Sequence, residues 1–434
     1  MRFGTLLELQ YPRPWPEDGE RQFFQDVLEQ AELTDKLGYH SVWEVEHHFL
    51  EEYAHSSSPE VFLAAISQRT KNLRLGHGIV LMPPGYNQTA RVAERIATLD
   101  LVSNGRVEFG TGESSSRAEL EGYGVPLEEK RAQWLECTEQ VANMLAMDPY
   151  PGYEGRYLSM PTRNVVPKAV QKPHPPMWMA CSNHEQIKLA AHLGLGALGF
   201  ALVDAKTAKG WIDEYYEIIK TECVPIGHTV NANIALTSPL SLDADEEKAR
   251  QRGFKGRYFF TFASNHHYVD GLHKPGRTDI WEQYEQAWPI LAKSFEGYGA
   301  PSTVGTPAQA RKMMQIYEDM GCDEVLFMAQ MGKIAHEDIC ESLRIFADEI
   351  MPEFQEREVQ KQQRKEEELA PYIEAALARK EWMQPLADDE IPVYEAYKRH
   401  VARAGEAEAG EVDEDHWVAA IDRLMRRTGA KPNA

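Results

Sequence analysis

The chain has 434 residues, 43% hydrophobic and 26% charged, with a formal net charge of −22. This composition is typical of a globular protein, and the length allows one large domain with extensions or two to three smaller ones. A surface with this negative charge repels nucleic acid and anionic membranes. We therefore expect neither as a partner. Five widely spaced cysteines favour reduced thiols, and with no apolar targeting segment they indicate a cytoplasmic protein.

Strand-like and helix-like patterns alternate along most of the chain. The strand patterns lie at 2–9, 41–45, 73–81, 106–109, 177–181, 197–202, 231–237 and 324–327. The helical patterns lie at 19–37, 58–70, 89–102, 127–145, 185–193, 205–220, 308–320 and 336–350. Eight strand–helix units predict an α/β fold, a (β/α)8 TIM barrel with a parallel sheet; a doubly wound open sheet is the alternative.

The remaining segments define the domain organisation. Residues 148–176, rich in proline, predict a long loop, and residues 238–305 form an insertion after the seventh strand. We therefore expect a barrel domain over 1–353 and a helical C-terminal extension over 354–434. In the extension, a charged helical run is followed by short helical patterns, each too short to be stable alone; disorder is the alternative for 404–416.

The most distinctive motif stands where the second strand ends. Glu46, His47, His48 and Phe49 follow an apolar strand pattern. Side chains at strand carboxyl ends face the ligand in β/α folds, and histidine titrates near neutral pH. An ion pair without chemistry is the alternative. A metal site is not expected, because adjacent residues of an extended chain point to opposite faces.

Three further segments suit a ligand at the same face. Residues 110–116, Gly-Thr-Gly-Glu-Ser-Ser-Ser, combine glycine with hydroxyl donors, although a tight turn is an equal alternative. Ser182 and Asn183 begin a helix that could bind phosphate or be simply capped. Gly78 interrupts a strand, which suits a flat ring lying on the backbone, or a bulge. His266, His267 and Tyr268 in the insertion are expected to be surface residues, with a place over the mouth of the barrel as the alternative.

Five segments together resemble the bacterial luciferase-like flavin-dependent monooxygenases over residues 1–353. They are GYHSVWEVEHHF, NLRLGHGIVLMP, RVAERIATLDLVSNGRVEFGTGES, PPMWMACSNHEQIKLAAHLG and CDEVLFMAQMGKIAHEDICESLRIFADEIMPEF, in this order. The resemblance implies a barrel with a mobile insertion. It also implies reduced FMN (FMNH2), usually delivered by a separate flavin reductase, and O2 as co-substrate, which form a C4a-peroxyflavin that oxidises a small organic substrate. Barrels of this family commonly form homodimers.

The resemblance also assigns roles to residues. His47 and Glu46 become the catalytic pair, with Glu46 also holding the flavin, while His48 supports them. The residues implied in binding the flavin are Glu46, Gly78, Ile79, Gly112, Ser114, Ser115, Ser182 and Asn183. A cis peptide bond is implied between Gly78 and Ile79. Aromatic residues expected to line the substrate pocket, with ordinary packing as the alternative, are Trp15, Phe49, Tyr53, Trp178 and Phe200.

One position departs from the family pattern. Glu113 stands where luciferase has an arginine that meets the flavin phosphate, so Ser114, Ser115 or Arg117 would have to replace that contact. An F420-dependent oxidoreductase on the same fold, or a flavin-binding protein without activity, are therefore the alternatives to a two-component FMNH2-dependent monooxygenase. The Glu-His-His-Phe motif favours the FMN branch.

Overall fold

The computed structural model describes residues 1–199, 205–294 and 301–394. The chain divides into two compact units, Met1–Pro385 and Leu386–Ala434. In the second unit residues 386–394 are described, and they contain neither helix nor strand. The expected helices beyond residue 395, and the possibly disordered 404–416, lie outside the described residues. The first unit extends past residue 353, because the helix that follows packs on the barrel.

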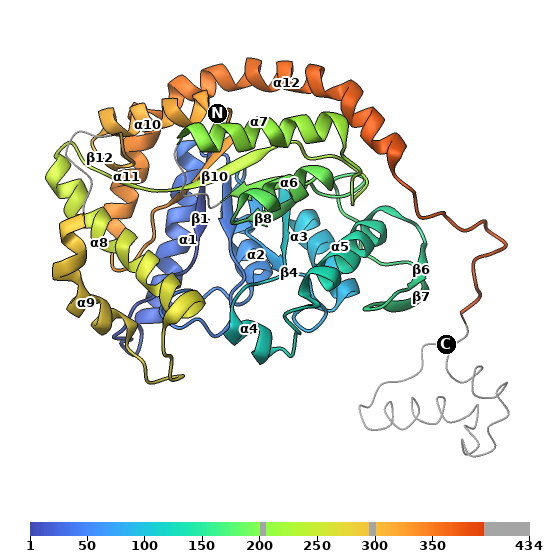
Figure 1. Ribbon diagram of the computed structural model, residues 1–434, viewed down its shortest axis with the longest axis horizontal. Helices are drawn as coiled ribbons and strands as arrows, with labels where there is room; N and C mark the ends of the chain where they lie inside the picture. Colours follow the sequence, from blue (N-terminus) through green and yellow to red (C-terminus); the bar gives the residue numbers. More distant parts are fainter. Residues whose placement is uncertain (200–204, 295–300, 395–434) are drawn as a thin grey trace, which may run out of the picture. The chain divides into compact units, whose positions relative to one another are not determined.

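The first unit is a closed eight-stranded parallel barrel, so the predicted fold is confirmed (Figure 1). Hydrogen-bonded neighbours run in the order β3-β2-β1-β13-β10-β9-β8-β5, and pairing of β3 with β5 closes the ring. The strands are β1 (Arg2–Leu7), β2 (Ser41–Glu44), β3 (Arg74–His77), β5 (Val107–Gly112), β8 (Met177–Cys181), β9 (Gly196–Gly199), β10 (Ile234–Pro239) and β13 (Glu324–Met328). The two-residue strand β4 (Val80–Leu81) resumes the third strand after a break at Gly78 and Ile79.

A helix follows each strand of the barrel. These are α1 (Gly19–Leu37), α2 (Pro59–Arg69), α3 (Thr89–Val102), α5 (Lys130–Ala146), α6 (His184–His192), α7 (Ala205–Thr221), α10 (Pro307–Asp319) and α11 (His336–Glu349). Local sequence sets their ends: Gly38 ends α1 with a φ of 83°, and Thr306 and Gln309 form a capping box on α10.

The connecting segments hold more structure than the sequence predicts. The expected loop 148–176 contains an antiparallel hairpin, β6 (Tyr150–Glu154) with β7 (Ser159–Arg163), and a short helix α4 (Arg117–Gly122) follows β5. The insertion contains α8 (Glu246–Asn265), the π-helix η1 (His266–Asp270), α9 (Ile280–Leu291) and the 3-10 helix η2 (Ala292–Ser294). Strands β11 (Ser241–Leu242) and β12 (Val304–Gly305) pair at its base.

The C-terminal helix α12 (Met351–Arg379) is longer than expected and continues through Pro371. Phe354, Leu369 and Ala376 bury one face of it, and this packing outweighs the hydrogen bond that proline removes. Figure 1 shows α12 running beside α7 on the barrel. None of the described helices is long and apolar enough to cross a membrane.

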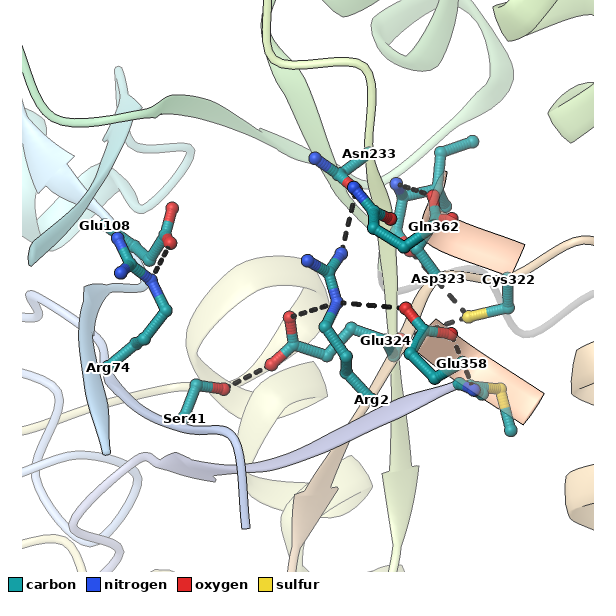
Figure 2. Close-up of polar contacts among 12 residues, drawn as sticks. Arg2, Ser41, Arg74, Glu108, Asn233, Cys322, Asp323, Glu324, Glu358 and Gln362 are labelled. Carbon is teal, nitrogen blue, oxygen red and sulfur yellow. Dashed lines mark hydrogen bonds and ion pairs between the residues drawn. The ribbon is translucent and has the colours of Figure 1, made fainter. Parts of the chain in front are cut away.

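Ion pairs hold α12 against the N-terminal ends of the strands (Figure 2). The amino group of Met1 lies 2.7 Å from Glu358 of α12, and Arg2 lies between Glu324 and Glu358 while donating to Asn233 at 2.8 Å. Arg2 and Glu324 are the first residues of β1 and β13, and Asn233 comes just before β10. The helix therefore covers the end of the barrel opposite the expected site.

Asp323 belongs to the same network and is 1% exposed, so its charge needs partners within the protein. It accepts hydrogen bonds from Lys365 of α12 at 2.8 Å and from the backbone of Ile234 at 2.9 Å. Burial alone raises the pKa of Asp323, but the lysines and Arg2 nearby outweigh it and hold that pKa below its usual value. The carboxylate is thus a buried charge that depends on Lys365.

We predict that Lys365→Met lowers the free energy of unfolding by about 3 kcal/mol, because it leaves Asp323 buried without its nearest counter-charge. Urea titration followed by circular dichroism measures the loss. Arg364→Met on the exposed side of α12 is the matched control and should change stability by less than about 0.5 kcal/mol. Equal effects of the two variants would contradict this account.

Candidate active site

A cavity of about 440 Å³ opens at the carboxyl ends of the barrel strands. Its wall combines residues that follow six strands with one face of α8 and with Tyr268 of η1. The lining residues include Glu8, Glu46, His47, Tyr53, Gly78, Ile79, Gly112, Glu113, Ser114, Ser115, Lys130, Ser182, Ser238, Arg257, Phe260, Thr261, Ser264, Tyr268, Met328 and Met331. This is the end of a β/α barrel where ligands bind.

His47 stands in the wall of this cavity between two carboxylates. Its Nδ1 lies 2.9 Å from Oε1 of Glu119, and its Nε2 lies 3.8 Å from Oε2 of Glu8. Its backbone N–H donates to Ser56 at 2.8 Å, which fixes the loop after β2. Burial lowers the pKa of His47, but Glu119, Glu8 and Glu46 outweigh burial and raise that pKa above its usual value.

Glu119 of α4 orients the imidazole. It is fully buried and accepts hydrogen bonds from the backbone N–H of His48 at 2.9 Å and from the hydroxyl of Ser114. Burial raises the pKa of Glu119, whereas His47 and these donors lower it, with a net decrease. An ionised Glu119 on Nδ1 leaves Nε2 as the nitrogen that exchanges a proton with the cavity.

Glu8 follows β1 and is 2% exposed. Its Oε2 has no hydrogen-bond partner in the structure. Burial raises the pKa of Glu8 to about 7, with Glu119 adding to the rise and His47 opposing it. Glu8 and His47 can therefore share one proton near neutral pH, beside the space where a ligand would sit.

Glu46 has a different role from His47. Its Oε2 accepts from the backbone N–H of Leu81 at 2.7 Å, and its Oε1 accepts from Asn87 at 2.8 Å and contacts Nε2 of His48 at 3.1 Å. Both oxygens are thus engaged in fixing β4 and the His48 ring. Glu46 shapes the cavity wall, and His48 supports it from behind, as the sequence suggested for His48.

The insertion forms the other wall of the cavity. The hydroxyl of Tyr268 lies 3.5 Å from Nδ1 of His47, and its ring packs edge-on to both His47 and Tyr53. The expectation that residues 266–268 are surface residues is therefore wrong for Tyr268, which lines the cavity, and for His266, which is buried. The sequence alone could not show the contact with His47, because the packing joins segments separated by 221 positions.

The end of the cavity near β5 and β8 carries hydroxyl and amino groups. Ser114 and Ser115 line it after β5, Ser182 lines it after β8, and Lys130 of α5 lines it too, donating to the Ser114 carbonyl at 2.5 Å. Asn183 lies outside the wall and caps α6, accepting from the backbone N–H of Gln186 at 3.0 Å. This end suits an anionic group such as a phosphate.

Glu113 stands where the family pattern has an arginine, and basic residues of the protein neutralise its charge. Glu113 binds Arg131 at 2.6 Å and lies 3.7 Å from Lys130. Arg117 instead pairs with Glu121 at 2.7 Å on the exposed side of α4, so it does not replace the missing arginine. Lys130, which sequence reasoning missed, supplies the positive charge at this end of the cavity.

The aromatic residues predicted to line the pocket are placed differently from one another. Tyr53 lines the cavity. Trp15 packs against Arg13 and His55, Phe49 is 55% exposed and stacks on Tyr123, and Trp178 fills the barrel interior against Trp43. These three are corrected to packing residues. Phe200 lies outside the described residues.

Gly78 and Ile79 line the cavity between β3 and β4, and Gly112 ends β5 beside them. The expected cis bond between Gly78 and Ile79 is not found: the cis peptide bonds of the described residues are Arg13-Pro14, Asp148-Pro149, Val166-Pro167 and Lys172-Pro173. The bond is trans, as non-proline peptide bonds usually are, and the Gly78 N–H donates to the backbone carbonyl of Glu44 at 2.7 Å. Gly78 contributes backbone alone to the cavity wall, and a Cβ added there would meet the Leu6 side chain at 3.1 Å.

A closed barrel with a cavity at the carboxyl ends of its strands is the architecture of β/α-barrel enzymes. The sequence model of the luciferase-like monooxygenases matches residues 1–324, and the chain belongs to this family. The oxygenase component of the flavin-dependent trigonelline monooxygenase of Acinetobacter baylyi is 23% identical, covering 83% of this chain and 97% of that protein. The uncharacterized protein y4vJ of Sinorhizobium fredii is 31% identical, but the alignment covers 43% of this chain and 55% of that protein.

Solved structures share the fold. Monooxygenase RslO1 from Streptomyces bottropensis is 25% identical with a TM-score of 0.65, covering 82% of this chain and all of that one. The oxygenating constituent of 3,6-diketocamphane monooxygenase from Pseudomonas putida, solved with FMN, gives a TM-score of 0.63 at 17% identity, covering 81% and 98%. An F420-dependent secondary alcohol dehydrogenase gives 0.60 at 19%, covering 80% and 98%.

The buried Glu8 carboxyl predicts a specific pH dependence of stability. A carboxyl whose pKa is raised on folding keeps its proton in the folded protein while the unfolded chain releases it, so stability falls as pH rises from about 4.5 to about 7. The raised pKa of His47 acts in the same direction. Glu8→Gln should therefore flatten this decline by up to about 3 kcal/mol.

Urea titrations across this pH window measure the effect. Glu121→Gln, which removes an exposed carboxylate of α4, is the matched control and should keep the wild-type slope. If Glu8→Gln and the wild type lose stability in parallel as pH rises, Glu8 is ionised throughout and the shared proton is excluded.

Proposed function

We propose that the protein is the oxygenase of a two-component, FMNH2-dependent monooxygenase that oxidises a small organic substrate with O2. The observation that carries this proposal is His47, held between Glu119 and Glu8 in the wall of a cavity at the strand carboxyl ends. The family supports flavin-dependent oxygenation, and the trigonelline relative is named as an oxygenase component, which supports a separate reductase as partner.

The residues present fit a reduced flavin mononucleotide. Gly78, Ile79 and Gly112 offer a flat wall for its ring system, and Lys130 with Ser115 and Ser182 would hold its phosphate. When bound, the flavin supplies the activated oxygen. Tyr53, Phe260 and Tyr268 exclude water from the same space, which favours transfer of that oxygen to the substrate over loss as peroxide.

His47 performs the proton step in this proposal. Glu119 fixes the ring through Nδ1, so Nε2 faces Glu8 and the cavity. A protonated Nε2 can donate to oxygen as charge develops there, and Glu8 can return a proton to the imidazole afterwards. The surroundings raise the pKa values of both groups, so the pair holds its shared proton more firmly than free side chains would.

Stopped-flow mixing of the protein and FMNH2 with O2 tests the proposal. We expect a delay before the absorbance of oxidised flavin returns, because the cavity would exclude water from a bound flavin. Free FMNH2 and the protein with F420 are the reference measurements. Oxidation as fast as that of free flavin, or tight binding of F420 with weak binding of FMN, would contradict an FMN monooxygenase and favour the F420 alternative.

We predict that His47→Ala leaves FMN affinity almost unchanged but reduces oxygen transfer by about 10²–10⁴-fold, the usual contribution of a general acid or base. Product formation and peroxide release in single turnovers measure the loss. His55→Ala is the matched control: its imidazole pairs with Glu20 and packs on Trp15. Unchanged transfer in His47→Ala removes the imidazole from the chemistry, and tight flavin binding without turnover of any tested substrate in the wild type would favour a non-catalytic role.

A further inference from the structure

Helix α8 lines the cavity with one side. Arg257, Phe260, Thr261 and Ser264 stand at the spacing i, i+3, i+4 and i+7, so their side chains share one face, and all four contribute to the cavity wall. Tyr268 of η1 continues this face and reaches His47. The insertion therefore presents a continuous surface, with the Arg257 guanidinium on its N-terminal part and the reaction centre at its C-terminal end.

The charge on Arg257 is not used by the part of the chain that the structure describes. Glu46 is bound by Leu81 and Asn87, Glu113 pairs with Arg131 and Lys130, and Glu8 faces His47. Within residues 1–199, 205–294 and 301–394, no carboxylate lies at ion-pair distance from Arg257. A half-buried guanidinium that faces a cavity without a counter-charge is poised for an anion brought by a ligand.

Other residues of the cavity wall indicate what the rest of that ligand would be like. Met328 and Met331 of the β13 end and Phe260 of α8 give an apolar wall that adapts in shape. Ser238 of β10 also lines the cavity, with its hydroxyl bonded to that of Thr303 at 2.9 Å. The ligand would thus have an apolar body and one anionic group.

Arg257 comes from a different segment of the chain from the residues that would hold the flavin phosphate. Those residues are Lys130 and serines of the segments after β5 and β8, whereas Arg257 belongs to the insertion that follows β10. Arg257 precedes Tyr268 by eleven positions, which is roughly 15 Å along a helix. A molecule whose anionic group rests on Arg257 can extend along α8 toward His47.

We propose that Arg257 binds the carboxylate of the substrate, so that the protein acts on small molecules with an apolar body and a terminal carboxylate. The planar guanidinium fork matches a carboxylate in two parallel hydrogen bonds. The site of oxidation is then the part of the substrate farthest from the acid group, next to His47. This inference rests on the proposed function for the reaction, but the binding that it predicts is measurable without turnover.

Binding of simple probes tests the proposal. Benzoate, phenylacetate, 3-phenylpropanoate and 4-phenylbutanoate, each compared with its neutral amide, are titrated calorimetrically into the full-length protein without flavin. We expect the wild type to prefer at least one acid over its amide by about tenfold or more, because a charge-assisted pair outweighs a neutral hydrogen bond. Arg257→Gln should abolish this preference and leave binding of the amides unchanged.

Two further variants complete the experiment. Arg277→Gln removes the same charge from an exposed position of the insertion, where the side chain contacts the backbone of Gly276, and should keep the preference. Arg257→Lys keeps the charge without the fork and should keep part of the preference. Loss of the preference in Arg277→Gln, or its survival in Arg257→Gln, would overturn the assignment, as would a wild type that binds acids and amides equally.

The flavin phosphate offers the same chemistry to a guanidinium, and a second titration separates the two sources. FMN and riboflavin differ by the phosphate, so their affinities are compared in the wild type and in Arg257→Gln. We expect both affinities to be unchanged. A loss of FMN affinity with riboflavin unaffected would assign Arg257 to the flavin and overturn the proposal. Because acid binding is measured without flavin, failure of the monooxygenase reaction would leave this result intact.

Discussion

Two tryptophans inside the barrel constrain the strands around them. Trp43 of β2 and Trp178 of β8 meet edge-to-face with their ring centroids 5.3 Å apart. A side chain at Gly76 would begin 2.1 Å from the Trp43 ring, and one at Gly196 would begin 2.3 Å from the Trp178 ring. The barrel can therefore close only because the strands beside the indoles carry glycine. The interior becomes a solid plug, and the space for a ligand is confined to the carboxyl ends of the strands.

The two tryptophans also separate two groups of buried charges. One group lies below them, at the N-terminal ends of the strands, and the other lies above them, at the carboxyl ends. Below them, Arg2, Arg74, Glu108 and Glu324 pair with one another or with Glu358 of α12, so charge is compensated within the protein. Above them, Glu8 lacks a hydrogen-bond partner for one oxygen, and its pKa rises to about 7. Uncompensated polar groups cost stability, so they are retained where a ligand uses them.

Sequence reasoning recovered the barrel because strand and helix periodicities repeat eight times and local signals end each element. It also identified His47, since a histidine at a strand end faces the cavity in this fold. It did not identify Glu119. Ser116 and Glu119 have the spacing of a capping box, which would turn Glu119 back onto its own helix, yet Ser116 makes no side-chain cap and Glu119 binds His47. A tertiary contact thus overrides a local pattern.

Other differences have the same origin. Trp178 looks like a pocket residue in the sequence, but only the closed barrel shows that its ring lies inward, against Trp43. The length of α12 depends on Phe354 and Leu369 packing on the barrel, which no local rule predicts. Lys130 stands seventeen positions after Glu113 in the chain and becomes its neighbour only when α5 folds back beside β5.

The division of labour within the cavity follows from which segments build it. His47, Glu8 and the donors near β5 and β8 come from strand ends, which the closed barrel holds in fixed positions. Arg257 and the rest of the α8 face come from an insertion that the barrel does not need in order to close. Substitutions on α8 can therefore change which molecule is bound while His47 keeps its position, except at Tyr268, where the two walls meet.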